Sequence, residues 1–178
     1  MPTYLAFLRA INVGNRKFAK DAIVRACEEA GCTDVETYIN TGNVRLTSTL
    51  RSRARVERAL EEAFRAEAGF DVPTIVLTPK ELSAIAADAD ELGRGHPGLH
   101  YVSLLKEQPT DAAVMKLHGA GKEGESAEVR GRGVHLLLGE DYHSAKLTNA
   151  VVERHLGVAT NRNIRVIRTL AEKWGDRP

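Results

Sequence analysis

The order of short apolar segments in residues 1–78 constrains the fold more than any other feature of this sequence. Residues 3–8 are almost all apolar or aromatic over a length too short for a helix, which is typical of a strand covered on both faces. Apolar residues then recur with helical spacing from Ala19 to Ala30, and Gly31 follows them as a helix stop. The chain therefore begins with a strand and a helix.

Residues 35–77 add a hairpin, a second helix and a further strand. Residues 35–40 and 44–47 alternate apolar and polar side chains around the turn pair Thr41-Gly42, which predicts a β-hairpin. An amphipathic helix is expected over residues 51–68, closed by Gly69, and a strand over residues 74–77. The order predicts an α+β fold whose first half, residues 1–78, is a ferredoxin-like βαββαβ sandwich.

This topology makes two predictions about neighbours in space. The end of the first strand and the turn of the hairpin should lie at the same edge of the sheet, so the polar stretches 9–15 and 38–43 should be close together. The core between the sheet and its two helices should contain large apolar side chains from each element, namely Phe7, Ile23, Leu60 and Phe64.

The rest of the chain predicts a second, smaller α+β half. Residues 79–98 are expected to be a connecting helix that starts at Pro79 and a glycine-rich linker, and residues 99–178 the second half. That half should begin as βαββ, with a strand at 99–105, a helix at 111–118 and a hairpin at 127–132 and 134–138. Two C-terminal helices should follow, one over residues 145–156 and one capped by Thr160.

Composition narrows the classes of function. A net charge of +1 gives no overall field toward nucleic acid or an anionic membrane. No apolar run approaches the ~20 residues of a membrane helix, and the first residues lack a secretion signal, so we expect a cytoplasmic protein without membrane association. Two cysteines and six scattered histidines have no metal-ligand spacing, so neither a metal nor another cofactor is predicted.

The first polar cluster offers hydrogen-bond donors without an acid or base. It comprises the side chains of Arg9, Asn12, Asn40 and Asn43, with Gly14 and Gly42 allowing the backbone to come close to a ligand. Such donors suit a phosphate, a carboxylate or the edge of a nucleobase, and the absence of a nucleophile or general base favours binding over catalysis. The alternative is that these Asn and Gly residues serve only the turns that contain them.

A second polar cluster is predicted at the starts of the two C-terminal helices. Its candidate ligand-binding residues are Lys146, Asn149, Arg162 and Asn163. Helix N-termini carry free N–H groups and partial positive charge, so cations beside them would form an anion site. The alternative is helix capping with exposed charge, and in an enzyme Tyr142 or His143 would supply an acid or base.

Four short stretches carry a family resemblance. LRAINVGN, TYINTGNV, AKLTN and the terminal TNRN occur in this order, and the chain resembles the widespread bacterial family named domain of unknown function 1697. The resemblance implies a two-part α+β protein with a ferredoxin-like first half and implies no activity. The chain departs from the family pattern at Ala10 and Asn15, where glycine is common, at Asn40-Thr41, where Gln-Ser is common, and at Ile164, where Trp is usual.

These observations predict a protein that binds an anionic small molecule, such as a nucleotide or a phosphate ester, through polar loops. Two other classes stay open: an enzyme that acts on a phosphate-bearing substrate, and a module that binds a protein partner through a sheet edge. A nucleic-acid partner is weakly supported, because the 5% aromatic content provides few residues for base stacking. The sequence does not indicate an oligomeric state.

Overall fold

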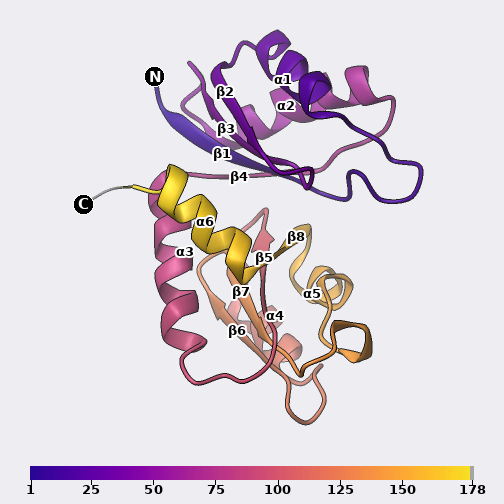
Figure 1. The fold of residues 1–178 in the computed structure, drawn as a ribbon, viewed down its shortest axis with the longest axis vertical. Helices are drawn as coiled ribbons and strands as arrows, with labels where there is room; N and C mark the ends of the chain where they lie inside the picture. The colour runs from indigo at the N-terminus through magenta and orange to yellow at the C-terminus, as the bar shows by residue number, and fades with distance from the viewer. Residues whose placement is uncertain (177–178) are drawn as a thin grey trace. The chain divides into compact units, whose positions relative to one another are not determined.

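The computed structural model describes residues 1–176. The chain divides into two compact units, Met1–Pro79 and Lys80–Pro178, and each contains one four-stranded sheet (Figure 1). All strand pairs within both sheets are antiparallel.

The first unit has the predicted βαββαβ order. The sheet order is β2-β3-β1-β4, so the first strand lies between the third and fourth, as the ferredoxin-like topology requires. The prediction of a ferredoxin-like α+β fold is therefore confirmed. Its elements are β1 (Thr3–Leu8), α1 (Lys20–Glu29), β2 (Thr33–Tyr38), β3 (Asn43–Thr47), α2 (Arg53–Ala68) and β4 (Thr74–Leu77).

The core of this unit lies between the sheet and α1 with α2 (Figure 1). Ile23, Leu60 and Phe64 are buried together there, as predicted. The prediction was wrong for Phe7, which is fully buried but does not belong to this cluster. Its neighbours at positions 6 and 8 do belong to it, and because side chains alternate along a strand, Phe7 points to the opposite face of the sheet.

The second unit repeats the same topology and adds two helices. Its sheet order, β6-β7-β5-β8, corresponds strand for strand to that of the first unit. The predicted βαββ is present, and a fourth strand that the sequence reading missed completes βαββαβ. The elements are α3 (Pro79–Leu92), β5 (His100–Leu105), α4 (Asp111–His118), β6 (Ser126–Arg130), β7 (Gly133–Leu137), the 3₁₀ helix η1 (Tyr142–Ser144), α5 (Asn149–Leu156), β8 (Ala159–Asn163) and α6 (Ile164–Trp174).

Two predicted helix starts in this unit were wrong. The helix expected from residue 145 begins at residue 149, where the Thr148 hydroxyl accepts a hydrogen bond from the Val151 N–H. Residues 146 and 147 are held outside it, because their N–H groups donate to the Glu125 carboxylate. Thr160 does not cap the last helix but lies in β8, which pairs with β5; the cap of α6 is Asn163.

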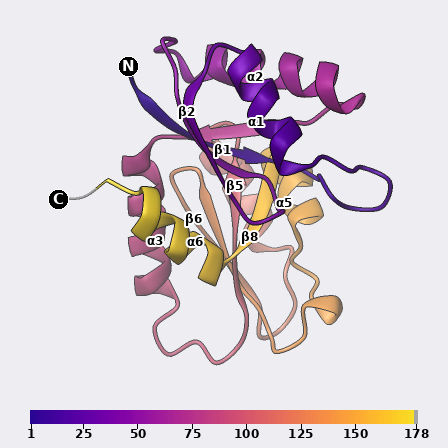
Figure 2. The same ribbon diagram turned by 45° about the horizontal axis from the view of Figure 1, so that its top comes forward.

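Helices cover both faces of the second sheet. Leu117 of α4 and Val152 of α5 pack with Val134 and Leu136 of β7 on one face. His135, between these two strand residues, points to the other face, which α3 and α6 cover (Figure 2). This arrangement places the start of α6 beside the end of α3 and the beginning of β5, where a cleft is found.

Candidate functional site

The two polar loops of the first unit are neighbours, as predicted. The Asn12 side-chain amide donates to the Asn40 carbonyl oxygen at 2.8 Å and to the Phe18 carbonyl oxygen at 3.2 Å. Its oxygen accepts from the Phe18 N–H at 3.0 Å. The side chain of Asn12 therefore joins the two loops, and its donors and acceptor are used within the protein.

The hairpin residues also serve the turn that contains them. Asn43 is fully buried, and its side-chain amide donates to the Tyr38 carbonyl at 3.1 Å and to the Thr41 hydroxyl at 2.9 Å. Gly42 has φ of +75°, and its carbonyl accepts from the Leu8 N–H at 2.8 Å. A side chain at position 42 would lie 2.7 Å from the Cβ of Leu8, so the close approach requires glycine.

Left-handed backbone is concentrated in these loops. Ala10, Asn12 and Ile39 have φ of +53°, +55° and +50°, although they are not glycine, and Gly14 has φ of +52°. Such angles are costly for residues with a Cβ. The half-buried Arg9 holds the loop through its N–H, which donates to the Pro73 carbonyl at 2.9 Å. In this cluster Asn12, Gly42 and Asn43 each make contacts that stabilise their own loops.

The predicted cluster before α5 is likewise held by internal bonds. The Lys146 side chain is exposed, and its N–H donates to Glu125. Burial opposes the charged form of Glu125, but hydrogen bonds from N–H groups of Lys146 and Leu147 outweigh it and lower the pKa of this carboxyl. Asn149 donates to the Ala159 carbonyl at 3.0 Å.

Tyr142 lies against Tyr101, with ring centroids 4.7 Å apart, and burial raises the pKa of Tyr142.

The terminal motif splits between a strand and a helix. Arg162 is buried in β8, where its guanidinium donates to the Thr160 hydroxyl and the Asn161 carbonyl, both at 2.8 Å. Burial lowers the pKa of Arg162 to about 10. Asn163 accepts from the Arg165 N–H at 2.8 Å and caps α6. Of the predicted ligand-binding residues, Asn163 is the one that lines the cleft described next.

A cleft of about 610 Å³ opens within the second unit. It is formed by the end of α3, the following glycine-rich loop, the start of β5 and the first turn of α6. Its lining residues are Gly93, His96, Gly98, Leu99, His100, Asn163, Ile164, Arg165, Val166 and Arg168. This volume is large enough for a small metabolite.

The cleft is electropositive. Arg165 and Arg168 are exposed on α6, and the Arg165 side chain has no ion-pair or hydrogen-bond partner within residues 1–176. Arg168 donates to the Asp90 carboxylate at 2.7 Å, an exposed pair that solvent screens. The first turn of α6 adds the partial positive charge of a helix N-terminus. The lining itself contains no carboxylate.

Two histidines bring further nitrogen atoms to this cleft. The His96 Nε2 lies 2.9 Å from the Leu138 carbonyl and 3.2 Å from the Leu99 carbonyl, so this nitrogen carries a hydrogen. His100 is 7% exposed, and its Nε2 lies 3.3 Å from the Nδ1 of His135, which is fully buried. Burial lowers the pKa of each member of this pair to about 4. His100 and His135 are therefore neutral near neutral pH.

The sequence did not predict the cleft, because the residues that line it come from the segment expected to be a linker and from the surface of the last helix. Two weak signals were present: His96 and His100 occur four residues apart at the end of the glycine-rich loop, and Arg165 and Arg168 follow a helix cap. Neither pattern indicates a site alone, since charged residues near a helix start are usually solvated.

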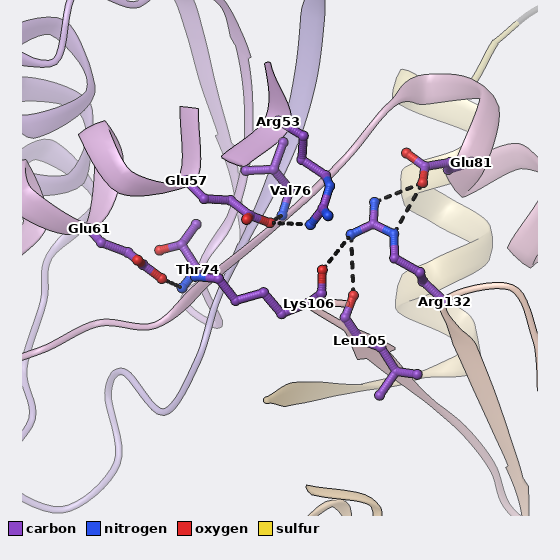
Figure 3. A network of polar contacts seen from close by, with 9 residues as sticks. All are labelled: Arg53, Glu57, Glu61, Thr74, Val76, Glu81, Leu105, Lys106 and Arg132. Carbon is purple, nitrogen blue, oxygen red and sulfur yellow. Dashed lines mark hydrogen bonds and ion pairs between the residues drawn. The ribbon is translucent and has the colours of Figure 1, made fainter. Parts of the chain in front are cut away.

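The β4 edge of the first sheet does not favour a partner strand. β4 is an edge strand, yet the N–H of Thr74 donates to Glu61 at 2.8 Å and the N–H of Val76 donates to Glu57 at 3.0 Å (Figure 3). Arg53 pairs with the same Glu57 oxygen at 3.1 Å. Because edge strands recruit other strands through such N–H groups, these carboxylates protect the edge.

Other classes of site are not evident in the described residues. No group of three or more His, Cys, Asp or Glu side chains among residues 1–176 is arranged to hold a metal ion. Within the same residues, no helix has both the length and the apolar character needed to cross a membrane.

Comparisons with known proteins agree with the fold. A family model described as a protein of unknown function, DUF1697, matches residues 1–135, which confirms the predicted resemblance. The conserved bacterial protein SP0830 from Streptococcus pneumoniae has a similar structure, with a TM-score of 0.75, 18% sequence identity and 98% of each chain covered. At this identity the likeness shows the fold alone. Among curated proteins, none matches the chain.

Proposed function

We propose that this chain, which belongs to the DUF1697 family of proteins of unknown function, binds a small anionic molecule such as a phosphate ester or a nucleotide. The ligand would occupy the cleft of the second unit, at the start of α6. A cytoplasmic location, expected from the sequence, is part of the same proposal.

One observation carries the proposal: a nine-tenths buried imidazole and an unpaired guanidinium line the same cleft. The Nδ1 of His100 has no hydrogen-bond partner among the described residues. The guanidinium N–H groups of Arg165 likewise have none there, so all of them are available to a ligand. A guanidinium matches the geometry of phosphate oxygens, and each charge-assisted hydrogen bond contributes about 1.5–3 kcal/mol. An anion there would also face the first turn of α6.

The test is ligand binding with a matched pair of variants. We expect sulfate, inorganic phosphate and a mononucleotide to raise the melting temperature, because binding at 100 times Kd stabilises the folded state by about 2.7 kcal/mol. Arg165→Gln should weaken binding about tenfold or more, the loss of one charge-assisted bond. Arg154→Gln is the control, since Arg154 is an exposed helical arginine of the same unit that does not line the cleft.

Equal affinity in wild type and Arg165→Gln, measured by calorimetric titration, would contradict the proposal. So would an equal loss in Arg154→Gln, because general charge would then explain the binding.

A further inference from the structure

We propose that His100 acts in this cleft as a neutral hydrogen-bond donor, through its Nδ1–H, and thereby selects fully deprotonated oxyanions such as sulfate and the phosphate monoester dianion. This inference rests on the proposed function and names the ligand class of the same site. It depends on the position of one proton in the pair of histidines.

The two polar atoms of the His100 ring have different surroundings. Nε2 faces His135 at 3.3 Å. Nδ1 faces Gly93, a lining residue of the cleft, where a Cβ would approach Nδ1 to 2.9 Å. A side chain at position 93 would cover Nδ1, so the glycine there keeps the approach to this nitrogen from the cleft open.

The surroundings of His135 decide which ring donates to the other. The Nε2 of His135 is fully buried and has no hydrogen-bond partner in the described residues. Gly133 and the apolar side chain of Ile85 lie on this side of the ring. If His100 donated the shared hydrogen, neutral His135 would carry its own hydrogen at Nε2, buried without an acceptor. Buried N–H groups without a partner are rarer than unsatisfied acceptors. His135 therefore donates from Nδ1, and His100 carries its hydrogen at Nδ1, toward the cleft.

Burial, together with the charged neighbours of the pair, keeps it neutral. His96 in the loop and Arg168 on α6 disfavour a proton on His100, whereas Asp90 on α3 favours it. His100 and Arg130 disfavour a proton on His135, whereas Asp88 favours it. Burial adds the largest effect at both rings, so each pKa falls to about 4. His100 consequently keeps one N–H and no charge from about pH 5 upward.

A neutral ring with its hydrogen toward the ligand offers a donor only. Every oxygen of sulfate or of a phosphate dianion accepts hydrogen bonds, so such an ion fits any orientation against His100 and Arg165. A phosphate monoanion carries one P–OH, and any orientation that turns this hydroxyl toward the His100 N–H sets two donors against each other. The monoanion therefore has fewer favourable orientations than the dianion, and it presents less negative charge to Arg165. The cleft should therefore discriminate by the ionisation state of the ligand.

The first test locates the proton without any ligand. Long-range ¹H–¹⁵N spectra of the imidazole rings, with His100 assigned by the His100→Asn variant, should show the Nδ1–H tautomer at about pH 7.5 and about pH 5.5. The Nε2–H tautomer, or an imidazolium spectrum near pH 6, would overturn the inference.

The second test measures selectivity. The ratio of phosphate-monoester affinity to sulfate affinity should fall about tenfold between about pH 7.5 and pH 5, because the monoester has a second pKa near 6 and sulfate does not titrate there. Taking a ratio cancels any effect of pH on the protein that is common to both ligands. A ratio independent of pH would contradict the inference.

A pair of variants assigns the selectivity to His100. His100→Asn places an amide N–H near the position of Nδ1 and should keep sulfate affinity, whereas His100→Gln places its amide near Nε2 and should lose about tenfold. Wild-type affinity in His100→Gln would overturn the inference. If sulfate binds through Arg165 while His100 has the wrong tautomer, this inference alone fails; if wild type binds no anion, the proposed function fails with it.

Discussion

The buried pair His100 and His135 predicts that the second unit loses stability as the pH falls below neutral. Both side chains are buried, 7% and 0% exposed, and burial lowers each pKa from 6.5 to about 4. In the unfolded chain both take up a proton near pH 6.5, whereas in the folded protein they do not until about pH 4. The unfolded state therefore binds more protons between these values, and stability must fall as the pH decreases through this window.

The magnitude follows from the two pKa values. Lowering the pH by one unit within the window costs at most about 1.4 kcal/mol for each histidine. From about pH 7.5 to pH 5.5 the unfolded state gains close to one proton per ring, so each ring costs roughly 1.3 kcal/mol and the pair roughly 2–3 kcal/mol. This loss is a large fraction of the about 5–15 kcal/mol by which an ordinary domain is stable.

The assay is urea denaturation followed by tryptophan fluorescence at the two pH values. Trp174 is the single tryptophan of the chain and is buried on α6, so its fluorescence reports on the second unit. His135→Leu should reduce the difference in unfolding free energy between the two pH values to about half. His118→Gln, which alters an exposed histidine on α4, should leave the difference unchanged.

Three results would refute this reasoning. The first is an unfolding free energy that does not change between the two pH values, and the second is a His135→Leu variant that retains the full wild-type difference. Equal effects of His118→Gln and His135→Leu would show that burial of the pair is not the cause.

Three further predictions concern the first unit and are checked by chemical denaturation. Phe64→Ala should cost roughly 3–5 kcal/mol, because Phe64 is fully buried in the core; a loss below about 1 kcal/mol would remove α2 from it. Gly42→Ala should destabilise more than Gly14→Ala, since both have positive φ but only a Cβ at 42 collides with Leu8, so equal losses would contradict the close approach. Ala10→Gly should stabilise by about 0.5–1 kcal/mol by relieving a φ of +53°, and any destabilisation would argue against that backbone angle.

The fold of the first unit could be predicted because its signals are local. Helical spacing in residues 19–30 and alternation in residues 35–47 each depend on neighbours along the chain. The topology follows from few choices once the element order is known. The second unit was harder, since β8 contains Thr160, Asn161, Arg162 and Asn163, a polar run without alternation. Pairing with β5, distant in sequence, makes this segment a strand.

The polar motifs show a similar limit. The sequence correctly placed Asn12 beside the Asn40 turn, because the topology alone requires it. The sequence could not show that the Asn12 side chain bonds to backbone groups and does not face solvent. An asparagine in a turn is the same residue type whether its amide bonds to the protein or to a ligand. Only the coordinates of the partner atoms distinguish a structural amide from a binding one.

The sequence by itself determined the element order, the ferredoxin-like topology of residues 1–78 and the family, because periodicity, turn residues and motif order are properties of the linear chain. Tertiary structure alone decided that His96, His100, Arg165 and Arg168 line one cleft. It also decided that His135 is fully buried in contact with His100. These residues come from a loop, two strands and a helix, and their approach depends on how α3 and α6 pack on the sheet. Burial and proton position are likewise set by this packing, since the pKa of an imidazole depends on its surroundings in three dimensions.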